Sequence, residues 1–260
     1  MDKDQAAQDY LVVCGSGLAK TDEGWAMAYG TPGRIKTAVD YVLEHPVAGM
    51  FLLGGHSKYG PAPPDGTKEA GLMRVYAERR LFRGGAMPVE TFQSLGKRTL
   101  GIVTDEDEPS SGDTIDNAIN LAKLIGEYEV SLGQNNRLLV VSGSGHYPRI
   151  KMLGGLALGW DKVMTDQTFD HLYVTGEDSL NGRIREGVGR QLVNILTSDI
   201  DTRMTEAQRL KQLRWVQTTL DRWMANKTSR TTLREIGQVA GYHMMNIWNS
   251  APSTNFPELY

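Results

Sequence analysis

The sequence predicts an α/β protein with a mainly parallel sheet, followed by a helical C-terminal extension. Strand-like apolar runs alternate with segments of helical periodicity from Tyr10 to about Leu196, which is typical of βαβ crossovers. Three of the apolar runs end in glycines, over residues 10–17, 50–55 and 138–145. Because parallel strands end at the same edge of a sheet, these glycine-rich ends predict one shared rim, where ligands bind in open α/β sheets.

The first half of the chain contains two predicted strands, each followed by a helix. After the strand that begins at Tyr10, a helix is predicted over 33–45. Its expected buried face consists of four apolar residues at helical spacing, Ile35, Ala38, Val42 and Leu43. The second strand leads into a loop over 54–66, whose length and proline and glycine content predict a lid or binding loop. A second helix is expected from about Thr67.

The second half continues the alternation. A third strand over 100–105 precedes an acidic turn and a helix that is capped by Asp113 or Thr114. Four apolar residues keep helical spacing in that helix, Ile115, Ala118, Ala122 and Ile125. The fourth strand covers 137–145, and either 161–165 or 171–175 supplies a further strand.

The pattern changes near residue 200, so we predict an α/β domain over 1–200 and a helical extension over 201–260. One helical face of the extension carries Leu213, Val216, Leu220 and Trp223. A second helix is expected from Thr231 to Ile247. These helices dock either on the sheet domain or on another subunit, which would make a homo-oligomer. Part of the second helix resembles a helix-turn-helix, but no basic recognition helix follows it, so DNA binding is not expected.

Composition narrows the function and the location. The chain has 260 residues and a net charge of −3, which argues against a mainly nucleic-acid-binding role. Its single cysteine, Cys14, excludes an intrachain disulfide and a multi-cysteine metal site. Residues 1–10 are polar and acidic, unlike a signal peptide, and no apolar run reaches the ~18 residues that cross a bilayer. We therefore expect a cytoplasmic protein whose partner is neither a nucleic acid nor a membrane.

Two glycine turns are candidate ligand-binding loops. The first, Gly15, Ser16 and Gly17, lacks the spacing of a dinucleotide fingerprint, and no helix opens directly after it. Its backbone N–H groups either bind an anion or belong to a tight turn without a ligand. Gly54 and Gly55 end the second strand and are expected at the same rim.

Two charged residues stand near predicted helix starts. Arg34 begins the first helix, where its guanidinium either clamps a phosphate or carboxylate or is simply solvated. Glu69 lies in the first turn of the second helix, where a carboxylate also favours the helix macrodipole.

Two further helix starts carry polar residues one turn apart. Thr114 and Asn117 form the first pair, and a capping role accounts for Thr114 but not for Asn117. His146 and Arg149 form the second, directly after the fourth strand and Ser142. Histidine is the usual general acid or base near neutral pH, although a histidine at a helix start is often a cap or a surface residue.

The remaining candidates are weaker. Cys14 is interpreted as a small buried hydrophobe at a strand end. His56 lies in the lid-like loop, within reach of a ligand at the rim. The acidic run over 105–108 either binds Mg²⁺ through its carboxylates or is solvated, and we predict no bound metal.

The order of these motifs resembles the YdcF-like domain family, which includes the SanA and ElyC envelope proteins. The resemblance covers roughly residues 10–160. It rests on CGSG at 14–17, Arg34, LLGG at 52–55, Glu69-Ala70, TIDNA at 114–118 and VSGSGHYPR at 141–149. It implies a Rossmann-like three-layer α/β sandwich with a polar pocket at the carboxyl ends of the strands. It also implies S-adenosylmethionine as a candidate cofactor. Unlike the envelope members, this protein is not expected to have a membrane anchor.

The predicted function is that of an enzyme acting on an anionic, phosphorylated or nucleotide-like small molecule, by hydrolysis or group transfer. Arg34 and Arg149 would clamp the anion, and the turn over 15–17 would donate backbone hydrogen bonds. His146 would be the general acid or base, with Glu69 orienting it or activating water. Two alternatives remain open. One is an S-adenosylmethionine-binding protein or methyltransferase, and the other is a non-catalytic ligand sensor.

Overall fold

The centre of the molecule is a parallel sheet of five strands. In the order in which they lie side by side, these are β5 (Gly101–Thr104), β4 (Val47–Leu53), β1 (Gln8–Cys14), β6 (Asn136–Ser142) and β7 (Phe169–Tyr173). Every neighbouring pair runs parallel. The chain moves outward from β1 in one direction and then, from β6, in the other. This doubly wound order confirms the Rossmann-like fold class and places the topological switch point between β1 and β6.

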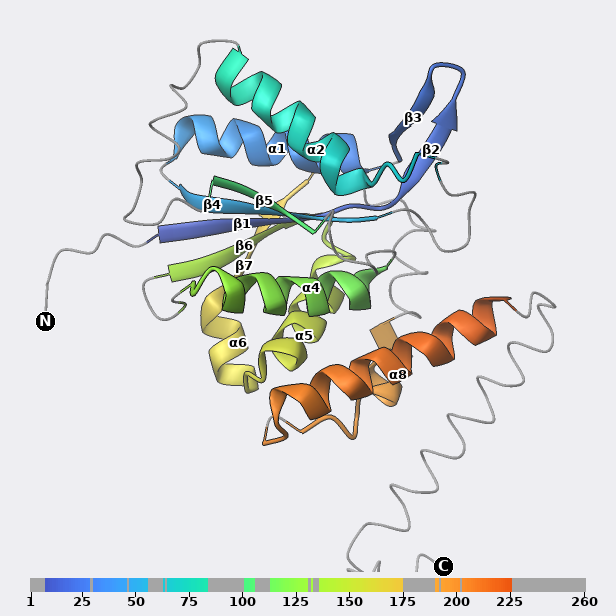
Figure 1. The fold of residues 1–260 in the computed structure, drawn as a ribbon. Coiled ribbons are helices and arrows are strands. Elements are labelled where there is room, and N and C mark those ends of the chain that lie inside the picture. Colours follow the sequence, from blue (N-terminus) through green and yellow to red (C-terminus); the bar gives the residue numbers. More distant parts are fainter. Residues whose placement is uncertain are drawn as a thin grey trace, which may run out of the picture.

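The structure is a computed structural model that describes residues 8–28, 30–45, 47–55, 63, 65–83, 101–105, 113–130, 132, 136–174, 190–191, 193–201 and 203–225. The sheet forms the middle of three layers (Figure 1). On one face lie α1 (Thr31–Glu44) and α2 (Glu69–Glu78), which runs on into a π-helical turn, η1 (Arg79–Arg83). On the other lie α4 (Thr114–Glu127), α5 (Tyr147–Leu158) and α6 (Lys162–Thr168).

The strands supply two cores because their side chains alternate between the two faces. Leu11 and Val13 of β1 pack with α1 and α2, whereas Val12 and Cys14 pack on the opposite side with α4 and α5. A sheet covered on both faces needs apolar residues at successive positions. That requirement explains the near-continuous apolar runs that predicted the strands.

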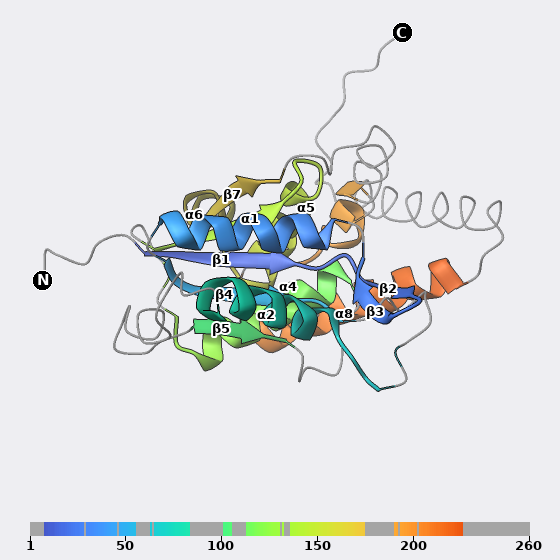
Figure 2. The same cartoon turned by 90° about the horizontal axis from the view of Figure 1, so that it is seen from above.

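The described part of the C-terminal extension packs on the α/β layers. Helix α8 (Glu206–Ala225) contacts α4 and α5 (Figure 2). Its Leu213 and Val216 are buried in a third apolar cluster with Ile119 of α4 and Leu153 of α5. The side chains of 220 and 223 and the predicted helix over 231–247 lie outside the described residues. Among the helices that are described, none is long and apolar enough to cross a membrane.

Three local predictions need correction. Residues 161–165 are not a strand but lie in α6, where the Asp161 side chain caps the helix by accepting from the Met164 N–H at 2.8 Å. The fifth strand, β7, overlaps the other candidate segment, 171–175, but begins and ends two residues earlier. Leu43 is 40% exposed, and Val39 takes its place on the buried face of α1.

The third correction is an antiparallel hairpin between β1 and α1 that the sequence prediction missed. It consists of β2 (Leu18–Thr21) and β3 (Gly24–Met27). Its turn depends on Gly24, whose φ of 126° is a conformation that favours glycine. The short polar run ending in that glycine was the available signal.

Candidate functional site

A polar cavity of about 320 Å³ lies at the carboxyl ends of the strands. Its lining contains every predicted site residue except His56 and Ser142, together with one residue that was not predicted to bind a ligand, Asp113. The residues are Gly15, Ser16, Gly17, Arg34, Gly54, Gly55, Glu69, Asp113, Thr114, Asn117, His146 and Arg149. The shared rim expected from the glycine-rich strand ends is therefore present.

Four helices begin at this cavity. Arg34 comes from the first turn of α1, Glu69 is the first residue of α2, Asn117 is in the first turn of α4, and His146 is the N-cap of α5. In a parallel sheet each strand leads into a helix that starts at the same edge. The positive ends of four helix macrodipoles therefore point toward one volume, which favours negative charge there.

The first glycine turn is occupied by a side chain of the protein itself. Gly17 N–H donates to Glu69 Oε2 at 2.7 Å, and Ser16 N–H donates to Oε1 at 3.2 Å. The hydroxyl of Thr31 donates to Oε1 at 2.6 Å, and Gly15 N–H donates to the Leu53 carbonyl at 2.7 Å. The predicted binding of a ligand anion by these N–H groups therefore needs correction, because the Glu69 carboxylate already accepts from the turn.

Burial changes the acidity of Glu69. The side chain is 1% exposed, and this desolvation raises the pKa of its carboxyl to about 7. The hydrogen bonds from Thr31, Gly17 and Ser16 and the charge of Arg34 act in the opposite direction. The carboxyl is thus near its titration midpoint at neutral pH.

A second buried carboxylate holds the neighbouring strand end. Asp105, directly after β5, accepts from Gly54 N–H at 2.9 Å and from Asn120 Nδ2 at 2.9 Å. Burial raises the pKa of Asp105 to about 6. The other members of the acidic run, 106–108, lie outside the described residues. Within the described residues, no group of three or more potential metal-ligating side chains is found.

Arg34 is anchored inside the rim. It is 6% exposed, and its Nη1 donates to the Cys14 carbonyl at 2.6 Å, so the solvated interpretation of this arginine is wrong. Cys14 is buried as predicted, and desolvation raises the pKa of its thiol to about 12. The thiol therefore stays protonated near neutral pH and is a poor nucleophile.

The opposite wall of the cavity comes from α4 and α5. His146 Nε2 lies 3.3 Å from Thr114 Oγ1, so the histidine is oriented by Thr114, whereas Glu69 was the residue expected to orient it. His146 Nδ1 and Asn117 Oδ1 are buried and have no hydrogen-bond partner among the described residues. Buried polar atoms are normally paired, so these two mark the side of the cavity that can hydrogen-bond a ligand.

The electrostatic surroundings keep His146 neutral. Burial lowers the pKa of its imidazole well below 6.5, and the charges of Arg149 and Arg34 lower it further. An imidazole next to two guanidinium groups is unprotonated at pH 7. A general base must be unprotonated before it reacts, and His146 meets that condition.

Asp113 is the residue that the sequence analysis treated only as a cap. Its Oδ1 accepts from the N–H groups of Ile115 at 2.8 Å and Asp116 at 3.0 Å, so Asp113 is the N-cap of α4. Thr114 is not the cap, and its hydroxyl lies next to His146. The other oxygen of Asp113 accepts from Gln217 Nε2 of α8 at 3.1 Å. That contact spans more than a hundred residues of sequence, so no local pattern could reveal it.

Two predicted ligand-binding residues do not join this group. Ser142 is fully buried at the end of β6, and its hydroxyl donates to the Gly143 carbonyl at 3.3 Å. His56 lies outside the described residues, as does most of the lid-like loop. Binding by either residue stays a prediction.

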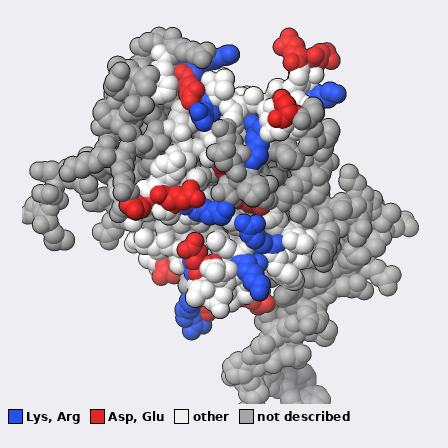
Figure 3. Space-filling model, in the orientation of Figure 1, with Lys and Arg blue, Asp and Glu red and all other residues white. Residues whose placement is uncertain are grey.

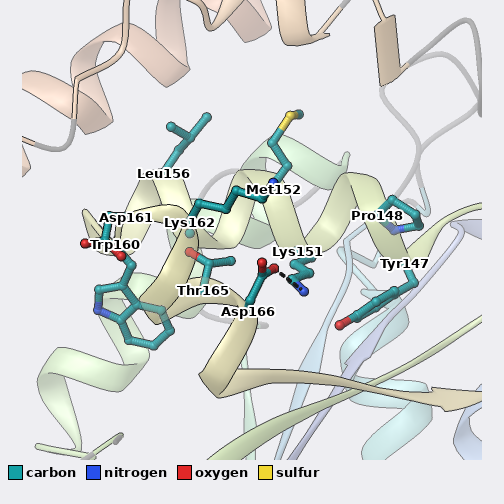
Figure 4. A pocket seen from close by; sticks show the side chains of 11 residues that line it. Tyr147, Pro148, Lys151, Met152, Leu156, Trp160, Asp161, Lys162, Thr165 and Asp166 are labelled. Carbon is teal, nitrogen blue, oxygen red and sulfur yellow. Dashed lines mark ion pairs between the residues drawn. The ribbon is translucent and has the colours of Figure 1, made fainter.

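A larger hollow of about 560 Å³ lies between α5 and α6 and shares no residue with the polar cavity (Figure 4). Tyr147, Met152 and Trp160 give it an apolar wall, and Lys151 pairs with Asp166 at 2.6 Å beside them. On the face drawn in Figure 3, Lys and Arg side chains lie among Asp and Glu side chains. The polar cavity is the better candidate site because it combines a topological switch point, buried ionisable groups and unpaired polar atoms.

Comparison with known proteins adds no relative. No family model matches the chain, and neither a curated protein nor a solved structure matches it. The fold and the geometry of the cavity are therefore the basis on which function is inferred.

Proposed function

We propose that the protein is an enzyme acting on an anionic, phosphorylated or nucleotide-like small molecule, by hydrolysis or group transfer. The observation that carries this proposal is the composition of the cavity. Two arginines, a neutral histidine and four helix N-termini line one volume at the carboxyl ends of the strands. Positive charge and N-terminal dipoles next to an unprotonated imidazole suit the binding of a phosphate or diphosphate and its reaction.

The negative side chains of the cavity do not cancel this preference. Glu69 accepts hydrogen bonds from Ser16 and Gly17, and Asp113 accepts them from the first turn of α4 and from Gln217. Backbone donors therefore partly neutralise both carboxylates. Arg34 and Arg149 line the same cavity as His146, and their charges lower the pKa of its imidazole. These two arginines remain the proposed anion clamp.

The roles of the reacting groups follow from the same contacts. His146 is the proposed general base, with Thr114 holding its ring. Asn117 presents an amide whose oxygen is buried without a partner and is the proposed contact to a donor group of the ligand. Glu69 mainly fixes the glycine turn, and activation of water by Glu69 stays a secondary proposal.

S-adenosylmethionine is the runner-up ligand. Its carboxylate could meet an arginine, but its adenine needs an apolar or aromatic slot. Among the described residues that line the cavity, none has an aliphatic, phenyl or indole side chain. The cavity volume is also at the lower end of the range for ligand sites, about 300–1,000 Å³. Both observations favour a small phosphorylated group.

Two coarser predictions accompany the function. We keep the YdcF-like family as the proposed affiliation, because each motif that carries the resemblance contributes at least one residue to the lining of the cavity. We also keep the cytoplasm as the proposed location.

The test is ligand-induced stabilisation of the purified protein. Pyrophosphate, adenosine monophosphate, a sugar phosphate and S-adenosylmethionine would each be added, with and without Mg²⁺. A ligand at about 100 times its dissociation constant stabilises the folded state by about 2.7 kcal/mol, which a thermal-shift measurement detects. We expect stabilisation by the phosphate compounds, its loss in Arg149→Ala, and its retention in Arg203→Ala. Arg203 is the matched control because its side chain is 90% exposed.

Other outcomes of this screen lead to the alternatives. Stabilisation by S-adenosylmethionine alone would overturn the phosphate proposal. Binding of phosphate compounds without turnover, in both the wild type and His146→Gln, would indicate a ligand sensor. Stabilisation that persists unchanged in Arg149→Ala would remove the anion clamp from the cavity.

A further inference from the structure

Helix α8 contacts both helices that form the ligand-facing wall of the cavity. In Figure 1 it lies beside α4 and α5, on their side away from the sheet. Leu213 and Val216 are fully buried against these helices. The apolar cluster therefore fixes α8 in one place, and any polar contact that α8 makes at the rim is held there by packing.

The contact of α8 with α4 and α5 extends at one end to the carboxyl end of α5. Arg209 is 8% exposed, and its guanidinium lies so close to Gly159 that a Cβ at that position would overlap it. Gly159 ends α5 in a left-handed conformation. A cation at this end of a helix interacts favourably with the macrodipole. The contact holds the helix whose other end begins with His146.

The other end of this contact lies at the start of α4. Gln217 is eight residues further along α8, about 12 Å at the rise of an α-helix. Its side chain is 5% exposed and donates from Nε2 to Asp113 Oδ2 at 3.1 Å. Asp113 uses its other oxygen to cap the first turn of α4. One carboxylate therefore joins α8 to the wall of the cavity.

The first turn of α4 is next to the proposed base. Thr114 follows Asp113 directly, and its hydroxyl lies 3.3 Å from His146 Nε2. A continuous series of contacts therefore runs from Gln217 through Asp113 and Thr114 to the imidazole. A displacement of Asp113 would move the hydroxyl that orients the ring.

We propose that Gln217 is a positioning residue of the site: through Asp113 it sets the start of α4 and thereby the orientation of His146. The C-terminal helix then belongs to the binding site as well as to the core. This inference rests on the proposed function for its effect on ligand affinity, but its effect on His146 is independent of any ligand.

The amide of Gln217 matters because it supplies a neutral donor to a carboxylate. In Gln217→Glu, two carboxylates face each other and repel, which weakens the contact between α8 and the start of α4. The double variant Asp113→Asn/Gln217→Glu exchanges the roles, because the amide at 113 then donates to the carboxylate at 217. Asparagine is as good an N-cap as aspartate, so the double variant keeps the start of α4.

The experiment measures the ring-nitrogen NMR signals of His146 in the ligand-free protein and the dissociation constant of pyrophosphate by calorimetry. We expect Gln217→Glu to shift the His146 signals and to weaken pyrophosphate binding about tenfold at pH 8. The double variant should restore both. Thr218→Ala, on the exposed side of the same turn of α8, should change neither.

Two results would overturn the inference. One is unchanged His146 signals in Gln217→Glu, and the other is an equal shift in the single and double variants. If Gln217→Glu does not fold, Gln217→Leu replaces it, because it removes the donor without adding charge. Unchanged His146 signals in Gln217→Leu would then overturn the inference. Failure of the wild type to bind pyrophosphate would count against the proposed function alone, because the His146 signals still decide the positioning role.

Discussion

The two sides of the cavity differ in how completely their polar groups are satisfied. On the β1 and β4 side, the glycine ends donate to buried carboxylates, Gly17 to Glu69 and Gly54 to Asp105. On the α4 and α5 side, Asn117 Oδ1 and His146 Nδ1 are buried without a partner among the described residues. The first side is a self-contained scaffold, and the second has buried polar atoms that are available to hydrogen-bond a ligand. The glycine turn over 15–17, a candidate ligand-binding loop in the sequence, therefore has a structural role.

The two sides of the cavity also differ in the direction in which burial shifts the pKa values of their ionisable groups. Glu69 and Asp105 have raised pKa values, so burial favours their neutral forms, and His146 has a lowered pKa, so burial favours its neutral form too. Neutral carboxyl groups are favoured by acid and a neutral imidazole by base. The two sides of one cavity are therefore expected to change stability in opposite directions as the pH rises.

The largest expected effect comes from breaking the scaffold side with Gly15→Ala. A Cβ at Gly15 overlaps Glu69 Oε2, and the carboxylate cannot move without releasing the N–H groups of the turn. Overpacking of this kind costs about 1–3 kcal/mol, and orphaned donors add to it. Urea unfolding measures the loss.

The matched control for that substitution is Gly126→Ala in α4. A Cβ there meets nothing within 4 Å. Its stability should stay within about 1 kcal/mol of the wild type, on the stabilising side, since alanine is the better helix former. An equal loss in both variants would show that Gly15 is not specifically required by Glu69.

The next effect separates two asparagines one turn apart on α4. Asn120 donates to Asp105, so Asn120→Ala leaves a buried carboxylate short of a donor and costs about 1–3 kcal/mol of stability. Asn117→Ala removes a buried oxygen that has no partner, so we expect a smaller loss of stability but weaker pyrophosphate binding. Chemical unfolding and calorimetry on both variants make the comparison. Equal effects of the two substitutions on both quantities would erase the distinction between scaffold and ligand-facing wall.

The third effect is the pH dependence of stability, which is the smallest per unit of pH. Glu69 has a folded-state pKa of about 7 against 4.5 for the ordinary group, so the folded state binds its proton more tightly. Its contribution is present below pH 4.5 and is lost as the pH rises toward 7, by at most about 1.4 kcal/mol per pH unit. His146 has the opposite sign, because its contribution is present above pH 6.5 and is lost as the pH falls.

Unfolding of wild type, Glu69→Gln and His146→Gln between pH 4.5 and 7.5 isolates the two contributions. The stability of the wild type relative to Glu69→Gln should fall as the pH rises. The stability of the wild type relative to His146→Gln should rise over the same range. Parallel curves for all three proteins would contradict the buried, neutral state of both groups.

The sequence predicted the fold and most of the cavity for one physical reason. Strand and helix signals are local, and in a parallel sheet every strand ends where the next helix begins. Residues that follow a strand or open a helix, such as Gly15, Arg34 and His146, must then meet at one edge. The sequence could therefore predict that these residues lie at one edge of the sheet without any knowledge of their contacts.

The sequence did not predict the partners of these residues, and this explains each correction to the site. Glu69 was expected to orient His146 or to activate water, but its carboxylate accepts hydrogen bonds from a turn more than fifty residues away. Either Asp113 or Thr114 was expected to cap α4, and the tertiary structure shows that Asp113 does so, with the support of Gln217 on the C-terminal helix. Hydrogen-bond partners depend on distances of a few ångströms between segments that only folding brings together. The sequence by itself determined where the cavity lies, and the tertiary structure decided which of its polar groups hold the scaffold and which stay unpaired and available to a ligand.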